Sequence, residues 1–540
     1  MKIFFLLFTF FVLTFNVFSF DMILVGDEIL EDIRFLSLKT GIPFLSFSPP
    51  LAPAEVRRFL DSIDDVALSN TIVEDAYNRI RARLSPVSNI SYTDDNFSLL
   101  LDIHLTFEAF VRFNTNIQRY PRYPDIIPFV SLPLRASFAN TVQLYLEPIY
   151  AYCISEHGKD RFNINIPFGL DPANRSASLR GFLAAGGDFW NFQIGRDRLF
   201  WGTGHTGSLI FSDNSQYFDF ARLSFFSTNV KYSAIVTQLP LQVRQRLFDL
   251  DDDKWNANRR ENDLLDRMIL QRYYYLHRLD FRLFNRVSIG LMEGLMVGNS
   301  PFELRYLNPL IIFHDLFSWY DFDKWRWGEH RGDMVGSLFS MEVNWNVLRN
   351  LAVYGQFVMN ELTLPGETNE NPNAMGYMLG VQYAFSFTNW RSVSFLEFFY
   401  TDPYLSILSS PFGSFIQMDY KQYYFIGYPR DTIAVIFGTN FYNKDTLNFA
   451  GRFSWIASGQ HNDNESTNGL TWDWREGPSS RAPTGTVEHK LILSLGAGWR
   501  PLSWLTFNTK ISGIVSLNNN HISGDNQIGG QVSFSAGLRY

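Results

Sequence analysis

The chain has 540 residues, a formal net charge of −8 and a sequence pI near 5.7, and it carries no basic stripe. This charge balance makes nucleic acid a poor partner, and the single cysteine, Cys153, excludes an internal disulfide. Hydrophobic residues make up 46% of the chain and aromatic residues 17%. After the N-terminal segment, however, no stretch has the roughly 18 uncharged apolar residues of a membrane-spanning helix, so a membrane location would require strands.

Residues 1–19 are predicted to be a secretory signal peptide. Lys2 precedes the almost wholly apolar stretch 3–17, and Val17 and Ser19 suit cleavage after Ser19. The stretch is too short for a membrane anchor and has the wrong flanks. No cysteine follows it, so a lipoprotein anchor is not expected.

Residues 20–90 are predicted to form a small α-helical region on the periplasmic side. Amphipathic patterns with apolar residues at helical spacing cover 27–40, 53–63 and 71–84. Each pattern needs a partner surface. Two arrangements are open: a separate periplasmic bundle, or a plug against the periplasmic mouth of a barrel.

From residue 97 the apolar period changes to two. The odd positions from Leu101 to Val111 are apolar, whereas the even positions from Asp102 to Arg112 are mostly polar or charged. This alternation is typical of a barrel wall with lipid outside and water inside. A soluble sheet with one wet face is the alternative. Residues 91–540 are therefore predicted to form a transmembrane β-barrel with long extracellular loops.

Short turns are predicted at regular intervals along this region, each between two β-like runs. If both chain ends of the barrel lie on the side of the short turns, eight turns imply nine hairpins. Nine hairpins give about 18 antiparallel strands in an up-and-down barrel. The longest outer loops are predicted at 241–271, 298–332, 403–429 and 460–485. The turns lie near residues 139–140, 188–189, 228–229, 285–286, 348–349, 388–389, 443–444 and 501–502.

The last nine residues, 532–540, alternate strictly between apolar and small or polar side chains and stop on Tyr540. Val532, Phe534 and Leu538 therefore share one face. An outer-membrane barrel ends in this way because that face meets lipid and the last strand pairs with the first. The pattern also resembles the signal that the barrel-insertion machinery recognises. A buried last strand in a soluble sandwich is the alternative.

The segment 195–209 contains Gly202-x-Gly204-x-x-Gly207, which matches the dinucleotide fingerprint by letter. That motif needs a following helix, and β-like residues follow here, so a loop that re-enters the barrel is favoured over a cofactor site. Arg196 and Arg198 are predicted on one face of the preceding strand, towards the lumen. There they would form a salt-bridge ladder or bind a carboxylate or phosphate of a passing ligand.

A second dense segment, 301–310, is followed by His314, Asp315, Trp319 and Tyr320. Trp and Tyr can stack on sugar rings while Asn, Arg and Asp bond hydroxyl groups. Aromatic side chains that pack the loop onto the barrel are an equal alternative.

No other pattern carries chemistry. The acidic run 249–253 lacks the Gly and Glu of an EF-hand, the nine histidines show no metal-ligand spacing, and no Gly-x-Ser-x-Gly elbow is present. Neither a metal, a cofactor nor enzymatic activity is predicted.

Two segments resemble the Wzi capsule-assembly family: GRDRLFWGTGHTGSLIFSDNSQYFDFARLSF (195–225) and PFELRYLNPLIIFHD (301–315). The segments DFWNFQIGRDR and WNVLRNLAVYGQ look similar too. The resemblance implies an 18-stranded outer-membrane barrel with a periplasmic helical bundle and a lectin-like role towards exported polysaccharide. One departure is that Gln216 and Tyr217 stand where family members often carry two prolines.

The sequence therefore predicts a non-enzymatic outer-membrane barrel that binds and anchors capsular or exopolysaccharide at the cell surface. A porin-like diffusion channel is the alternative. The predicted partners are surface polysaccharide, outer-membrane lipid, the barrel-insertion machinery and polysaccharide export proteins. The candidate polysaccharide-binding residues are Arg196, Arg198, Trp201, His205, Asp213, Asn214, Arg305, Asn308, His314, Trp319 and Tyr320.

Overall fold

The computed structural model describes most of the chain between residues 20 and 540. The predicted signal peptide, 1–19, lies outside the described residues, as do most of the predicted long outer loops. The described ranges are 20–64, 71–85, 88–117, 127–152, 162–166, 175–213, 217–240, 271–298, 302–308, 335–361, 373–407, 413–415, 418–419, 422–423, 427–444, 446–460 and 481–540.

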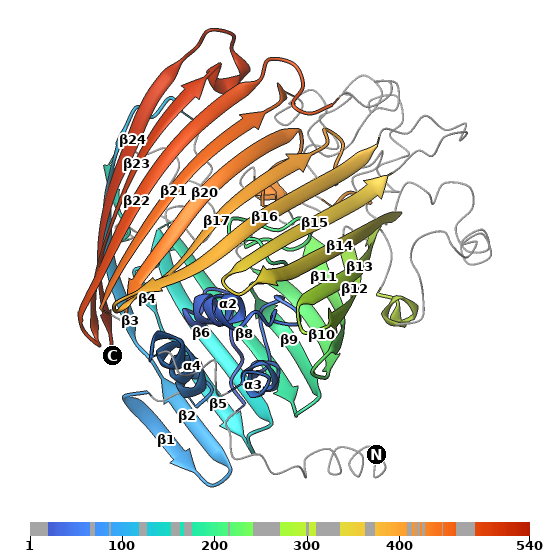
Figure 1. Cartoon of the computed structure of the whole chain (residues 1–540), viewed down its shortest axis with the longest axis vertical. Helices are drawn as coiled ribbons and strands as arrows, with labels where there is room; N and C mark the ends of the chain where they lie inside the picture. Colours follow the sequence, from blue (N-terminus) through green and yellow to red (C-terminus); the bar gives the residue numbers. More distant parts are fainter. Residues whose placement is uncertain are drawn as a thin grey trace, which may run out of the picture.

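One antiparallel sheet of 22 strand segments closes into a barrel of 18 strands, as predicted (Figure 1). β4 (Val130–Ser131) and β5 (Leu134–Phe138) together form one wall strand, because both pair with β6 (Val142–Tyr152). β1 (Ile90–Asp94), β2 (Phe97–Leu101) and β7 (Phe162–Ile164) pair beside the ring. A separate hairpin joins β18 (Met418–Asp419) to β19 (Gln422–Tyr423).

The remaining wall strands follow one another around the ring in chain order. They are β3 (His104–Phe113), β8 (Arg175–Gly186), β9 (Trp190–Asp197), β10 (Phe218–Phe226), β11 (Val230–Pro240), β12 (Gln271–Leu283), β13 (Val287–Gly298), β14 (Val335–Leu348), β15 (Leu351–Glu361), β16 (Ala374–Phe387), β17 (Trp390–Thr401), β20 (Thr432–Asn443), β21 (Leu447–Ser458), β22 (Glu488–Leu502), β23 (Leu505–Leu517) and β24 (Gln527–Arg539).

The predicted turns are confirmed, because each joins two paired strands. The last is displaced the most: residues 501 and 502 still belong to β22, and the turn follows at 503–504. Asn and neighbouring residues adopt positive φ at several of these turns, for example Asn140 (φ 53) and Asn285 (φ 52), a conformation that Asn tolerates better than most residues.

The predicted closure of the sheet is also confirmed. β24 pairs with β3 over ten residues, from Gly530↔Phe113 to Arg539↔His104. Val532, Phe534 and Leu538 are exposed on the outer face, while Ser533 and Ser535 are buried inside. This is the pattern of a strand whose outer side chains contact lipid.

The first predicted strand is interrupted. The alternation from Leu101 to Val111 divides at Asp102 into β2 and β3, and only β3 enters the ring. Arg135 donates to the Asp102 carboxylate at this break. The β1–β2 hairpin consequently extends beyond the barrel at the end where the C-terminus lies (Figure 1).

The three predicted helices are present as α2 (Ile29–Thr40), α3 (Pro53–Asp61) and α4 (Thr71–Arg83). Gly41 ends α2 in the left-handed conformation (φ 75), and its N–H donates to the Ser37 carbonyl. No helix in the described part of the chain is both long and apolar enough to cross a membrane.

These helices and their connections, residues 20–64 and 71–85, form a plug in the turn-side end of the barrel (Figure 1). Their apolar side chains share one buried cluster with the wall residues Ala352, Ala384 and Val393. The backbone N–H of Asn350 donates to the Leu38 carbonyl, at 2.7 Å. The plug arrangement, one of the two that the sequence left open, is therefore the observed one.

Opposite charges attach the plug to the wall around the ring. The plug supplies carboxylates, and β5, β11, β17 and β22 supply cations. The pairs are Asp21–Arg135 (3.4 Å), Glu55–Lys231 (2.5 Å), Asp32–Arg391 (2.7 Å) and Glu28–Arg500 (2.8 Å). Because the cations lie on strands far apart in the ring, they fix the position of the plug from several sides.

Candidate functional site

Residues 198–213, between β9 and β10, form an inward loop that folds into the lumen. Nearly all of these residues are buried, and Trp201 and Phe211 form an antiparallel bridge within the loop. This confirms the prediction of a loop that re-enters the barrel. The βαβ unit that a dinucleotide site requires is absent, since β10 follows the loop.

The three glycines of the fingerprint-like motif serve close packing. Gly202 has φ +156, and a Cβ on Gly204 would lie 2.2 Å from the Gly207 carbonyl oxygen. A Cβ on Gly207 would lie 2.6 Å from Gly427 Cα, which belongs to a loop on the opposite side of the lumen. Side chains at these positions would force the loop away from its contacts.

Apolar side chains of the inward loop fill one half of the lumen. Leu199, Trp201 and Phe211 are fully buried against inward-facing residues of β10 to β17. The Trp201 and Phe211 rings meet edge to face, with centroids 5.4 Å apart. This half of the barrel contains a packed core instead of the watery lumen that the strand pattern predicts.

Glu397 of β17 holds the tip of the inward loop. Its buried carboxylate accepts hydrogen bonds from the backbone N–H groups of His205 (2.6 Å) and Thr206 (3.1 Å), and from the Tyr354 hydroxyl (2.8 Å). The Thr206 hydroxyl donates as well. A carboxylate inside a barrel is thus satisfied by neutral donors, without a cation in direct contact among the described residues.

The plug contacts the same loop. Arg34 of α2 donates to the carbonyl oxygens of Thr203 (2.5 Å) and Gly204 (3.0 Å). The Thr203 hydroxyl donates to Glu342, which also accepts from Arg278 (3.3 Å). Plug, inward loop and wall therefore form one connected polar network.

His205 lies inside this network. Its ring stacks on Phe395 with centroids 4.3 Å apart, and Nε2 lies 2.9 Å from Gln382 Oε1. Burial, together with the positive charges of Arg34 and Arg452, holds the pKa of His205 well below its ordinary value, although the Gln382 contact opposes this. The imidazole is therefore neutral at pH 7.

The prediction that Arg196 and Arg198 share the lumen face is wrong. Arg196 lies on the outer face of β9 and forms a two-bond pair with Asp219 of β10, directly opposite (2.7 and 2.8 Å), with side chains 49% and 54% exposed. Arg198 lies beyond the end of β9, inside, 3.6 Å from Asp213. The two-residue spacing fails because the strand ends at Asp197.

Trp201 is buried in the core, so it is not available to stack on a sugar in this structure. His205 is half-buried, and its ring stacks on Phe395 and hydrogen-bonds with Gln382. Asp213 lies at the edge of the inward loop. Trp201 and His205 hold the loop to the wall, whereas Asp213 pairs with Arg198 within the loop.

The described part of the second predicted segment, residues 302–308, lies elsewhere, against the outside of the barrel. It contains a short 3-10 helix, η4 (Leu304–Leu307), whose Tyr306 packs on the outward-facing Val236, Tyr275 and Leu295 (Figure 1). For Tyr306, this is the packing alternative that the sequence left open.

Within that segment, Arg305 pairs with Glu303 (2.6 Å), and Asn308 and Leu304 are exposed, Leu304 by 73%. An exposed apolar side chain on the outside of a barrel is suited to contact with lipid. The described residues of the two candidate segments are therefore not brought together into one site.

Four predicted site residues, Asn214, His314, Trp319 and Tyr320, lie outside the described residues, as does the acidic run 249–253. Among the residues that the structure describes, no three His, Cys, Asp or Glu side chains are grouped to hold a metal ion.

Sequence reasoning missed Glu397 and Arg34, which hold the inward loop. A signal for Glu397 was present: it is the single charge within the aromatic run Phe395-Leu396-Glu397-Phe398-Phe399. No local pattern marks Arg34, because its partners are carbonyl groups about 170 residues away.

The other half of the lumen differs from the packed half. Asn448 and Ala450 of β21 and Asn508 and Lys510 of β23 are exposed. They alternate with outward-facing aromatic and apolar residues such as Phe507, so they face inward. Solvent therefore reaches the inner wall along β21–β23.

Comparison with known proteins gives a family and a fold. The family model described as capsule assembly protein Wzi matches residues 130–428. Wzi of Escherichia coli, described as an outer-membrane carbohydrate-binding β-barrel involved in group 1 capsule assembly, has a similar structure. Its TM-score is 0.57 at 14% identity, with 95% of this chain and 98% of that chain covered.

Two porin structures are more distant. OprD of Pseudomonas aeruginosa has a TM-score of 0.40 at 9% identity, covering 82% of this chain and 93% of its own. A BenF-like porin of Pseudomonas fluorescens Pf-5 has a TM-score of 0.40 at 8% identity, covering 82% and 99%. No curated protein matches the chain.

Proposed function

The chain belongs to the Wzi capsule assembly family, and from this premise we propose that it binds and anchors exported capsular or exopolysaccharide at the cell surface. It is an outer-membrane β-barrel, and its role would be binding without catalysis. The carbohydrate binding described for Wzi of Escherichia coli supports the same role here.

The observation that carries the proposal is the filled interior. The plug occupies the turn-side end, and the inward loop packs half of the lumen around Trp201. A barrel that uses so much of its interior for packing offers its outer end, not a wide pore, to a polymer.

We propose that six of the predicted site residues contact the polymer, through aromatic stacking and hydrogen bonds to hydroxyl groups. Trp201 and His205 would act as positioning residues, because they hold the inward loop. The residues proposed to contact polymer are Asp213, Asn214, Asn308, His314, Trp319 and Tyr320.

The test is retention of purified capsular polymer by proteoliposomes that contain the protein. We expect Trp319→Ala with Tyr320→Ala to reduce retention, whereas Trp504→Ala, an exposed tryptophan in a turn at the other end, leaves it unchanged. Absence of retention for every capsular polymer tried would exclude the proposal.

A diffusion channel is the second candidate, and the exposed inner wall along β21–β23 favours it. Planar-bilayer recording separates the two: a large, steady current indicates a channel, and a silent barrel indicates a binding protein. The barrel-insertion machinery and polysaccharide export proteins remain proposed partners.

A further inference from the structure

One buried guanidinium near the plug has no partner among the residues that the structure describes. Arg282 faces inward at the turn-side end of β12 and is 6% exposed. Its Nε and one terminal nitrogen, NH1, are fully buried without a hydrogen-bond partner among the described residues. No ion pair of Arg282 is present in the described part of the chain.

Two neighbouring inward cations, in contrast, form ion pairs. Arg278, four residues earlier on β12, pairs with Asp280 at 2.7 Å and with Glu342 at 3.3 Å. Lys231, on the adjacent strand, pairs with Glu55 at 2.5 Å. Because a buried charge without a partner is costly, Arg282 is the position where a counter-charge from outside the chain is expected.

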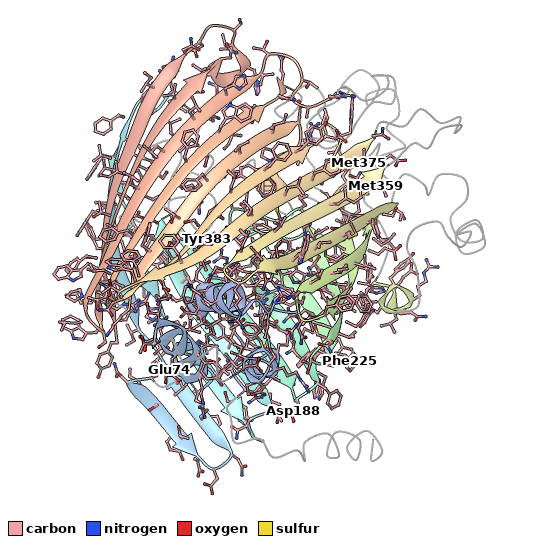
Figure 2. All side chains as sticks on the ribbon, in the orientation of Figure 1. Glu74, Asp188, Phe225, Met359, Met375 and Tyr383 are labelled. Carbon is pink, nitrogen blue, oxygen red and sulfur yellow. The ribbon has the colours of Figure 1, made fainter. Side chains whose placement is uncertain are left out.

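Arg282 lines a pocket between α3 and the β10–β11 turn. The pocket is narrow and is partly open to solvent at the turn-side end. Figure 2 shows Asp188, in the β8–β9 turn, and Phe225, close to the end of β10, in this part of the barrel. The lining residues are Phe44, Leu45, Glu55, Arg58, Phe59, Phe226, Ser227, Thr228 and Arg282.

The carboxylate in this pocket, that of Glu55, already accepts hydrogen bonds through both of its oxygens. Glu55 Oε2 accepts from Lys231, and Glu55 Oε1 accepts from the Ala52 N–H at 3.1 Å. The second arginine of the lining, Arg58, donates through Nε and NH2 to the Asp188 carbonyl oxygen, at 3.1 and 2.9 Å. Two cations and one engaged anion leave the lining with an excess of positive charge.

We propose that this pocket binds a small oxyanion group, a carboxylate or a phosphate, with Arg282 as the main ligand and Arg58 at the mouth. A guanidinium offers two parallel donors to such a group. The aromatic walls of Phe44, Phe59 and Phe226 limit the space around it. The site opens at the turn side, so it is independent of the proposed polymer binding at the outer end.

The experiment measures thermal unfolding of the full-length protein in detergent during titration with sodium phosphate or sodium acetate, at ionic strength matched with NaCl. We expect a saturable rise of about 1–2 °C with at least one oxyanion. The arm that responds identifies phosphate or carboxylate. In Arg282→Met the response is lost, and in Arg286→Gln, an exposed arginine four residues later, it is kept.

A second readout separates binding from a structural role. Without oxyanion, Arg282→Met should unfold at the same or a higher temperature than the wild type, because an unpaired buried charge has been removed. If this variant does not fold, as judged by heat-modifiable migration, Arg282→Lys replaces it. That variant keeps the charge but loses the paired donors, so we expect its oxyanion affinity to fall about 3- to 10-fold.

Equal responses of the wild type and the Arg282 variants would overturn the proposal. A wild type that responds to neither oxyanion would overturn it too. A lower unfolding temperature of Arg282→Met without oxyanion would assign Arg282 a structural role instead.

Discussion

Two segments fill the barrel, and their contacts with the wall differ in kind. The plug is attached by carboxylates that meet cations on β5, β11, β17 and β22. The inward loop is attached by neutral donors to Glu397, and by the apolar packing of Trp201 and Phe211. The plug begins the described chain, whereas the inward loop is continuous with wall strands at both ends.

The difference follows from how each segment reaches its place. A segment tethered at one end can dock in many orientations, and complementary charges at several positions select one of them. The inward loop is already confined by β9 and β10, so packing and hydrogen bonds made by its own uncharged groups suffice.

The largest effect is expected from Lys231→Met. The change leaves the Glu55 carboxylate buried without its cation, and we expect a loss of about 3–5 kcal/mol in the free energy of unfolding. Denaturant unfolding in detergent measures it, with Arg286→Met as an exposed control. Adding Glu55→Met should recover most of the loss, and equal losses in the single and double variants would contradict the charge-based attachment.

The next effect is expected from Glu397→Gln in the inward loop. The amide brings an NH2 group towards donors that need an acceptor, so we expect a loss of about 2–4 kcal/mol. Bilayer conductance should rise as the loop is released. Glu74→Gln, on the exposed side of α4 (Figure 2), is the control. If the loss in unfolding free energy caused by Glu397→Gln depended on salt as strongly as the loss caused by breaking a plug ion pair, the proposed difference between the two attachments would be refuted.

A smaller effect comes from the lowered pKa of His205. The His205 imidazole takes up a proton at a higher pH in the unfolded chain than in the folded protein. Its contribution to stability is therefore fully present above pH 6.5 and is lost as the pH falls. Arg34, Arg452, Glu397 and Tyr354 are the titratable groups around the ring.

One proton gives a slope of at most about 1.4 kcal/mol per pH unit. Unfolding measured from pH 7.5 to 5 should show a smaller loss for His205→Gln than for the wild type. Identical slopes would mean that His205 binds its proton equally well in both states.

The smallest effect is expected at the rim of the plug. Glu28 is mostly exposed, at 65%, and Arg500 is 25% exposed, so Arg500→Gln should cost no more than about 1 kcal/mol. The cost should vanish at 1 M salt, where screening is strong. Unfolding at low and high salt measures it, and a cost that persists at 1 M would place this pair among the buried ones.

Much of the fold follows from local patterns. The period of two in β3 and β24 places Phe107 and Phe534 on the lipid face whatever their neighbours are, and Asn140 and Asn285 mark turns by their own conformational preference. The helices 29–40, 53–61 and 71–83 are equally local, since spacing and Gly41 suffice to indicate them.

The candidate site was predicted less well. Arg196 and Arg198 appeared to share a face because spacing alone does not show that β9 ends at Asp197. Trp201 appeared to be a sugar-stacking residue, yet the same apolar surface that suits a sugar also suits a core. Local sequence does not distinguish these outcomes.

By itself the sequence determined the strands, the turns, the helices and the outward apolar face, because each depends on periodicity within about ten residues. Only the tertiary structure decided that the N-terminal helices enter the barrel, that residues 198–213 fold inward and that residues 302–308 pack outside. Those placements depend on contacts between distant residues, such as Arg34 with Thr203 and Glu397 with His205. No local pattern records which of several compatible surfaces a segment will meet.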